Sequence, residues 1–441
     1  MSEPAVALLG FVVMLGLIAL RMPVGLAMLV TGAVGYAHLS SFAAFLAYMK
    51  TNTYHQFANY TLSVIPLFVL MGALAERAGL SSALFRAAAA LIGHRRGGLA
   101  IATIAACAAF GAICGSSVAT TATFGRACLP ELNRYRYDPG FATGTVAVGG
   151  TLGILIPPSV ILVVYAIACE QNIAKLFMAA MVPGLLAALF YCLVIAVVTR
   201  LRPNLAPAGS EGIASETGRA AHLAEVWPAL AVAAIVVGGI YGGVFTPTEA
   251  AAIGAASMLA IGLLNRSLGP SEVRASLMQT AETSAMIFII FLGSEVFSAF
   301  LAFSQLPQSA SSWIAGLGLS PYVVMIGLMA FYILLGAVMD ELAMLLLTLP
   351  VFFPIVTALD FGLAPGETAI WFGILVLVVV GIGLTAPPIG LNVFVVSSIA
   401  REVPIAATYR GVLPFLAADM VRLGLLLAFP GIALGLMRWL S

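Results

Sequence analysis

The sequence predicts an all-α polytopic membrane protein, organised as an inverted repeat with about ten membrane spans and two re-entrant helical hairpins. First, the 441 residues are 62% apolar and only 8% charged. Second, apolar runs of about 20 residues recur along the chain, and they are continuous rather than alternating, which excludes a membrane β-barrel. Third, Pro157-Pro158 and Pro387-Pro388 interrupt such runs at corresponding places in the two halves.

The first 62 residues are predicted to hold scaffold spans and an arm helix. Nothing basic precedes the first apolar run and a second span follows it, so we expect a retained helix rather than a signal peptide. In residues 42–60, Phe42, Phe45 and Tyr48 share one helical face, as do Tyr54, Phe57 and Tyr60, and Lys50, Asn52, His55 and Gln56 lie among these aromatic residues. This pattern favours a helix in the membrane interface over an ordinary loop. The predicted spans of the whole chain are residues 4–20, 23–40, 63–80, 139–170, 175–200, 226–245, 248–265, 276–304, 367–400 and 411–437.

Two repeats follow the N-terminal scaffold, separated by a linker. The first repeat, 63–200, holds a hairpin near 97–134 and a broken helix near 139–170; the second, 276–441, holds a hairpin near 320–357 and a broken helix near 367–400. Between them, residues 201–275 hold a cytoplasmic linker rich in proline and glycine and, after it, scaffold helices. Proline removes a backbone donor and clashes with the preceding turn, so neither proline pair can lie in one straight helix. Backbone freed at that depth must be buried in protein or line a wet cavity.

The spacing of matched residues supports the repeat. Gly111 and Gly336 lie 225 residues apart, the proline pairs lie 230 apart, and Pro183 and Pro414 lie 231 apart. Because the two hairpins enter from opposite sides in this layout, the repeats are inverted.

Basic residues orient the layout by the positive-inside rule. With the N-terminus outside, the outer side holds only Lys50, Lys175 and Arg438. The cytoplasmic side then holds Arg21, Arg77, Arg86, Arg95, Arg96, Arg134, Arg136, Arg200, Arg202, Arg219, Arg266, Arg274, Arg401 and Arg410.

The first hairpin carries a cluster of hydroxyls at its tip. Ser116 and Thr120 lie one helical turn apart, as do Ser117 and Thr121. Such a tip offers the neutral oxygens that a hard monovalent cation needs, although the hydroxyls could equally bond the preceding turn or join helices.

The second hairpin carries Asp340-Glu341 in the corresponding place. Acids at membrane depth are functional candidates unless they are paired or hydrated, and Glu341 could equally reach an aqueous vestibule. Glu282, Glu295 and Asp419, also within spans, could bond a neighbouring helix or contact a partner subunit.

The sequence gives little support for an enzyme or a cofactor-binding protein. The chain has no Gly-x-Ser-x-Gly elbow, no His-Glu-x-x-His pair and no phosphate-binding loop, and its cysteines and histidines lack metal-ligand spacing. We therefore expect no enzymatic activity and no cofactor. Without a phosphate loop the chain would not hydrolyse ATP, so energy would come from an ion gradient or another subunit. A net charge of +1 gives no indication of nucleic-acid binding.

Five segments together resemble the large, DctM-like membrane subunit of tripartite ATP-independent periplasmic (TRAP) transporters. They are Ile65-Pro-Leu-Phe68, Gly111-Ala-Ile-Cys-Gly-Ser-Ser117, Gly150-Thr-Leu-Gly-Ile-Leu-Ile-Pro-Pro-Ser159, Gly243-Val-Phe-Thr-Pro-Thr-Glu-Ala250 and Leu384-Thr-Ala-Pro-Pro-Ile-Gly390. The resemblance implies a sodium-driven elevator-type importer of organic acids in the bacterial inner membrane. It also implies two partners, a separate small four-helix membrane subunit and a periplasmic substrate-binding protein.

The resemblance also implies site residues. The first sodium site takes Ser116, Ser117, Gly153, Ile156 and Pro158, and the second takes Gly336, Gly383, Thr385, Ala386 and Pro388. The substrate is placed between them on geometric grounds, near Thr120, Asp340 and Asn392. The alternatives are a standalone ion-coupled dicarboxylate carrier that needs no binding protein and, from another class, a channel or structural membrane subunit.

Overall fold

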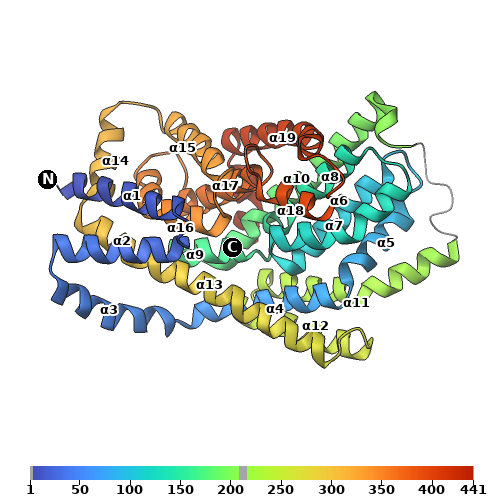
Figure 1. Cartoon of the computed structure of the whole chain (residues 1–441), viewed down its shortest axis with the longest axis horizontal. Helices are drawn as coiled ribbons and strands as arrows, with labels where there is room; N and C mark the ends of the chain where they lie inside the picture. The colour runs from blue at the N-terminus through green and yellow to red at the C-terminus, as the bar shows by residue number, and fades with distance from the viewer. Residues whose placement is uncertain (1–2, 208–215, 441) are drawn as a thin grey trace.

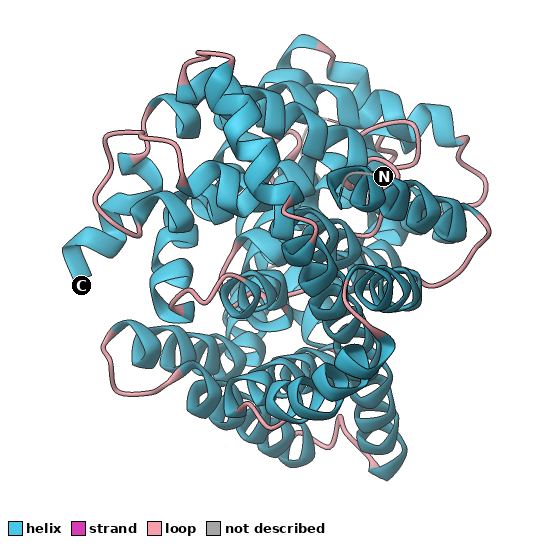
Figure 2. Ribbon diagram, turned by 90° about the vertical axis from the view of Figure 1, so that its left-hand side faces the viewer, coloured by secondary structure: helices cyan, strands magenta, loops and turns pink. Residues whose placement is uncertain are grey.

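The computed structural model describes residues 3–207 and 216–440, and these residues form helices joined by loops, with no strand among them (Figure 1, Figure 2). The all-α prediction is therefore confirmed. Residues 208–215, part of the predicted linker, lie outside the described ranges.

The first half contains α1 to α10. The N-terminal helices are α1 (Glu3–Ala19), α2 (Val24–Leu39), α3 (Phe42–Phe57), the short 3₁₀ helix η1 (Tyr60–Ser63), α4 (Val64–Arg77) and α5 (Leu80–Ile92). The first hairpin is α6 (Gly98–Cys114) and α7 (Ser117–Arg134); the first broken helix is α8 (Pro139–Leu155) and α9 (Val160–Ala168), bent by 44°. The long helix α10 (Ile173–Leu201) and η2 (Pro203–Leu205) follow.

The second half repeats this order. After α11 (Glu216–Tyr241) and α12 (Pro247–Leu264) come α13 (Pro270–Phe303) and α14 (Leu306–Gly316). The second hairpin is α15 (Pro321–Gly336) and α16 (Glu341–Thr357), and the second broken helix is α17 (Glu367–Gly383) and α18 (Leu391–Ile399). The chain ends with α19 (Ile405–Ala428) and α20 (Gly431–Leu440). Helices therefore end and begin near both predicted hairpin tips and at both proline pairs, whereas the re-entrant nature of the hairpins stays a prediction.

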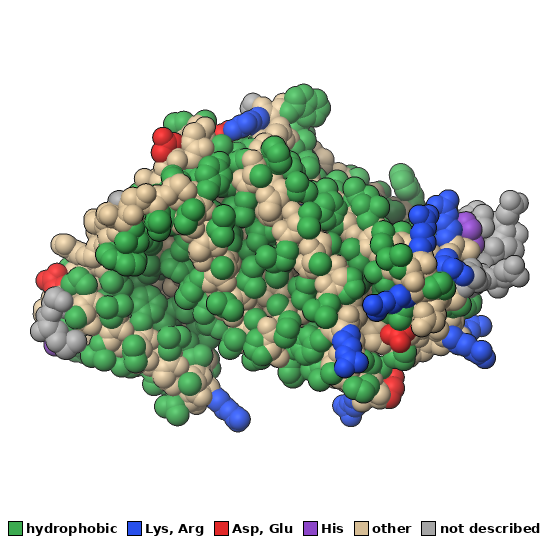
Figure 3. All heavy atoms as spheres, turned by 90° about the horizontal axis from the view of Figure 1, so that it is seen from above, with side chains coloured by type: hydrophobic (Ala, Val, Ile, Leu, Met, Phe, Trp, Pro, Cys, Tyr) green, Lys and Arg blue, Asp and Glu red, His purple; other side chains and the backbone are tan. Residues whose placement is uncertain are grey.

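The lengths of the helices indicate how many of them could each span a membrane. Within the described residues, six helices are long and apolar enough to cross a membrane, and the bent pair α8–α9 would make a seventh. The shorter α1, α2 and α17, also predicted as spans, are apolar helices of 16 or 17 residues. Figure 3 shows a largely apolar face, with Lys and Arg gathered toward its right-hand end, where α5 lies and α11 begins in Figure 1.

Small residues allow α2 to pack closely on α13. A Cβ atom added at Gly25 would lie 2.9 Å from the Ile290 backbone, and one added at Gly32 would lie 2.7 Å from the Phe297 backbone nitrogen. Close backbone approach through small residues is a usual mode of helix association in membranes, where burial of apolar surface gives no advantage.

The predicted arm coincides with α3, whose described side chains are exposed or half-buried. It runs antiparallel to α13: Asn52 donates to the Glu295 carboxylate at 3.3 Å, and the Phe57 ring lies 5.9 Å from that of Phe288. A helix is thus present in this segment; its place in the membrane interface stays a prediction.

One prediction about elements was wrong, and two helices were not predicted. The predicted single span 411–437 consists of α19 and α20, because Phe429 precedes Pro430 and leaves the α conformation (φ −130°, ψ 77°), as residues before proline tend to do. The predicted span 63–80 is followed directly by a further helix, α5, for which no helix was predicted; α14 was missed in the same way.

Candidate functional site

The tip of the first hairpin contacts the first broken helix just after its proline pair. Gly115 ends α6 with a φ of +66°, which glycine adopts without strain, and its carbonyl accepts a 3.3 Å hydrogen bond from the Val160 N–H. A Cβ on Gly115 would lie 2.9 Å from the Pro158 carbonyl oxygen. Backbone oxygens of the hairpin and of the broken helix therefore meet at this tip.

The end of α8 packs against the start of α7. A Cβ on Gly153 would lie 2.5 Å from Thr120 Oγ1 and 2.6 Å from the Ser116 carbonyl oxygen, and Thr120 Oγ1 donates to that oxygen at 2.7 Å. The Ser116 hydroxyl caps α7 by accepting from Ala119 N–H. The structure thus brings Ser116, Gly153 and Pro158 together around Gly115, whereas the Ile156 side chain packs toward Gly184 of α10.

The second hairpin makes the counterpart contact. The Ala337 carbonyl, at the end of α15, accepts hydrogen bonds from Ile389 N–H at 3.2 Å and Gly390 N–H at 3.3 Å. Gly336 and Gly383 lie in backbone contact, since a Cβ on Gly383 would lie 2.6 Å from the Gly336 carbonyl carbon.

The other predicted residues of the second site lie in the loop that follows α17. Thr385 Oγ1 bonds to the Ile382 carbonyl at 3.1 Å, and the Ala386 N–H bonds to the same oxygen at 2.9 Å. The Pro388 carbonyl accepts from the Tyr409 hydroxyl at 3.0 Å. Both proline pairs contain a cis peptide bond.

A cavity of about 450 Å³, here called the tip cavity, lies between the two hairpin tips and the helices α4 and α13. Residues from the first turns of four helices line it: Val118 of α7, Val160 of α9, Glu341 of α16 and Leu391 of α18. Helix N-termini present free N–H groups and a partial positive charge, which attract anions. The end of α6 also lines the cavity, whereas α8, α15 and α17 end at or against the hairpin tips outside the lining. Such helix ends offer carbonyl oxygens suited to cations.

Of the three predicted substrate residues, only Asp340 lines the tip cavity. Thr120 and Asn392 are fully buried behind its wall. Asn392 of α18 donates to Ser117 Oγ at 2.8 Å and to the Ala147 carbonyl at 3.1 Å, so it connects the second broken helix to the first hairpin and to α8.

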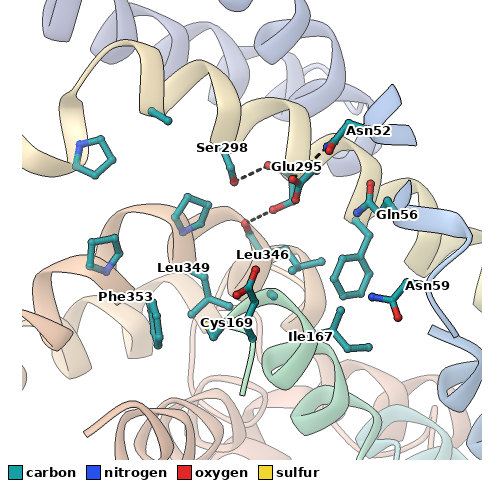
Figure 4. Close-up of a pocket in the computed structure, with 18 of the residues that line it drawn as sticks. Asn52, Gln56, Asn59, Ile167, Cys169, Glu295, Ser298, Leu346, Leu349 and Phe353 are labelled. Atoms are coloured by element: carbon teal, nitrogen blue, oxygen red, sulfur yellow. Dashed lines mark hydrogen bonds between the residues drawn. The ribbon is translucent and has the colours of Figure 1, made fainter. Parts of the chain in front are cut away.

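A second cavity, of about 600 Å³, lies among α3, α13, α16 and the end of α9, and we call it the vestibule (Figure 4). Asn52, Gln56 and Glu295 give it a polar wall. On its other side Ser294 Oγ donates to the Leu346 carbonyl at 2.8 Å, which ties α13 to α16. The vestibule and the tip cavity share α13 and α16 but are lined by different turns of each helix.

One buried ion pair was not predicted from the sequence. Asp419 and Arg422 of α19 are almost fully buried and 2.7 Å apart, and the Tyr191 hydroxyl of α10 donates to Asp419 at 2.8 Å. Tyr191 also contacts the Thr151 hydroxyl of α8, at 3.2 Å, two residues before Gly153. Asp419 therefore bonds its own helix and a neighbouring one. The i, i+3 spacing of Asp419 and Arg422 was the available signal.

By class, an all-helical membrane protein with two hairpins set against two interrupted helices is a transporter, and comparisons with known proteins agree. The model of the family described as "Tripartite ATP-independent periplasmic transporter, DctM component" matches residues 11–432. The chain belongs to this family and is a TRAP transporter large permease, not an enzyme.

Three relatives illustrate the family. The chain is 39% identical to the C4-dicarboxylate TRAP transporter large permease protein DctM of Pseudomonas aeruginosa, over 87% of each chain. It is 32% identical to the ectoine permease TeaC of Halomonas elongata, over 85% of each chain, and 31% identical to the sialic acid permease SiaM of Vibrio cholerae, over 84% of this chain and 85% of that one.

A solved structure supports the fold. The YdaH transporter of Alcanivorax borkumensis superposes with a TM-score of 0.65, at 16% identity and over 90% of each chain. This similarity concerns the fold alone.

Proposed function

We propose that the protein is a sodium-coupled importer of small organic acid anions in the bacterial inner membrane. The observation that carries this proposal is the paired geometry around the two hairpin tips, where four helices begin at the tip cavity and four others end at or against the tips. Helix beginnings suit the carboxylate of a substrate, and helix ends with freed carbonyls suit sodium ions.

The two sodium ions would lie between each hairpin tip and its broken helix. The first would be held near Ser116, Gly153 and Pro158, and the second near Gly336, Gly383 and Thr385. Each ion would join a hairpin to a broken helix and so complete the walls of the tip cavity, which couples ion binding to substrate binding. One charge crossing a potential of about 100 mV gains about 2.3 kcal/mol, so two ions gain roughly twice that before their concentration gradient is counted.

The relatives' names support a small organic acid as the substrate, since they cover C4-dicarboxylates, sialic acid and ectoine. Family membership supports the two partners, a periplasmic binding protein that delivers the substrate and a small membrane subunit bound to the scaffold. The cluster of basic side chains at one end supports a cytoplasmic position for that end and a periplasmic N-terminus.

Reconstitution tests the proposal. The chain, its small subunit and its binding protein in proteoliposomes should take up an organic acid only with an inward sodium gradient. Uptake that is unaffected when potassium replaces sodium would refute the ion assignment. Equal uptake by this chain alone would favour a standalone carrier.

A further inference from the structure

The two hairpin tips have the same backbone role but different chemistry. Ser116 and Asp340 each cap the second helix of a hairpin, and Ser117 and Glu341 are the first residues of those helices. Each matched pair is separated by 224 residues, which agrees with the 225-residue spacing of Gly111 and Gly336. At the tip cavity the first hairpin therefore contributes the hydroxyl-bearing Ser116, whereas the second contributes the carboxyls of Asp340 and Glu341.

Of the three carboxylates that line the tip cavity, two already have donors. Glu76 accepts from Arg126 at 3.0 Å and from the Thr123 hydroxyl at 2.9 Å. Asp340 Oδ2 accepts from the N–H groups of Leu342 and Ala343, at 3.1 and 3.2 Å.

Glu341 is the exception. Its side chain lines the cavity, the residue is only 7% exposed, and its Oε2 has no hydrogen-bond partner among the described residues. None of the cavity-lining residues in the described chain is Lys, Arg or His. A buried carboxylate without a partner is strongly unfavourable, so a positive charge is expected to enter the cavity with the ligand.

Resting on the sodium-coupled import of small organic acids proposed above, we propose that the imported acid also carries a cationic group and is a zwitterion rather than a dicarboxylate anion. Its carboxylate lies against the N-termini of α7 and α9, where the hairpin carries only hydroxyls, and its ammonium or other cationic group pairs with Glu341 of the opposite hairpin. Glu341 is then a specificity-determining residue that favours amino-acid-like cargo over dicarboxylates, which would place a second negative charge beside it.

Matched probes test the proposal on the purified full chain. In glutarate and 4-aminobutyrate, and in succinate and β-alanine, one carboxylate is replaced by an ammonium group at nearly constant length. Thermal denaturation in detergent, in the presence of sodium, is titrated with each probe for the unaltered protein, Glu341→Gln and the control Glu282→Gln. Glu282 is exposed on α13 and does not line the cavity.

The amino acids should stabilise the unaltered protein and the control at lower concentration than the matched dicarboxylates. Glu341→Gln should weaken the apparent affinity for the amino acids about tenfold, which is the effect of losing a hydrogen bond to a charged group. The apparent affinity for the dicarboxylates should not become weaker. Stabilisation by sodium alone should persist in this variant. If Glu341→Gln does not fold, the ranking of the four probes on the unaltered protein still decides.

Three results would overturn the proposal, and they differ in what else they refute. Dicarboxylates that bind as well as their amino analogues would exclude a zwitterion and leave the proposed function standing. Loss of the sodium effect in Glu341→Gln would identify Glu341 as a cation ligand instead. No stabilisation by any of the four probes, with the sodium effect intact, would also refute small acids as the cargo of this cavity.

Discussion

Substituting Gly383 with alanine tests most directly how a hairpin tip is coupled to a broken helix, because the backbones of Gly336 and Gly383 are in contact. In Gly383→Ala the new Cβ would lie 2.6 Å from the Gly336 carbonyl carbon and 2.7 Å from its Cα. These are backbone atoms, so no side-chain rotation can relieve the overlap and the second hairpin must move away from α17.

The same helix provides a matched control. A Cβ on Gly381 would meet Thr151 Cβ at 3.7 Å and Leu155 Cδ1 at 4.0 Å, which are ordinary contacts. Both substitutions gain the helix preference of alanine over glycine, roughly 0.5–1 kcal/mol. Only Gly383→Ala adds overpacking, which costs about 1–3 kcal/mol. The two variants should therefore differ by about that amount.

If the second sodium ion binds where the tip and the broken helix meet, the overpacking should weaken the free energy of sodium binding by the same amount. The half-saturating sodium concentration should then rise roughly 5- to 140-fold in Gly383→Ala, and change little in Gly381→Ala. It is measured from sodium titrations of thermal denaturation and of uptake in proteoliposomes. Equal sodium dependence in two well-folded variants would refute the coupling of this contact to the ion.

Three further substitutions have defined outcomes. Asn392→Ala should slow uptake and lower the free energy of unfolding by about 1–3 kcal/mol, because Ser117 and the Ala147 carbonyl lose a buried donor; uptake at the unaltered rate would contradict this. Asp419→Leu should destabilise the protein by about 3–5 kcal/mol in thermal denaturation, because Arg422 keeps an unpaired buried charge. Replacing both Asp419 and Arg422 with Leu should recover most of the stability that Asp419→Leu loses, and a double variant as unstable as the single one would contradict the reasoning. Arg438→Ala should lower the denaturation midpoint, but by less than Asp419→Leu does, because its bidentate ion pair with Glu367 is half exposed on the arginine side.

Local signals explain why the hairpins and the interruptions were predictable. Gly115 followed by Ser116, and Asp340 before an apolar run, are end and start signals of helices that act within a few residues. The proline pairs act in the same local way. Because these signals recur at constant spacing, the sequence also indicated which tip belongs to which broken helix.

Long-range contacts were not predictable from one sequence. Ser117 and Asn392 are 275 residues apart, and nothing in either segment indicates that they bond. Asn392 and Thr120, which are predicted near the substrate, are fully buried and do not line the tip cavity. Tyr191, which joins α10 to Asp419, lies in an apolar run without any distinguishing pattern. The break at Pro430 carried a local signal that the apolar composition of 411–437 outweighed.

The positions of the two cavities indicate what must move for a substrate to pass. The tip cavity is lined by Gln279 to Ile287 of α13 and by the first residues of α16, whereas the vestibule is lined by later turns of both helices. At the vestibule wall Ser294 is bonded to the Leu346 carbonyl, and the neighbouring Leu345, which lines neither cavity, is almost fully buried. If the substrate enters through the vestibule, we propose that it reaches the hairpin tips by a shift of α16 along α13 or by separation of the two helices. Since α16 begins at Asp340, which caps it, the same displacement carries one wall of the tip cavity with it. Opening one cavity and reshaping the other would then be a single movement, as an alternating-access transporter requires.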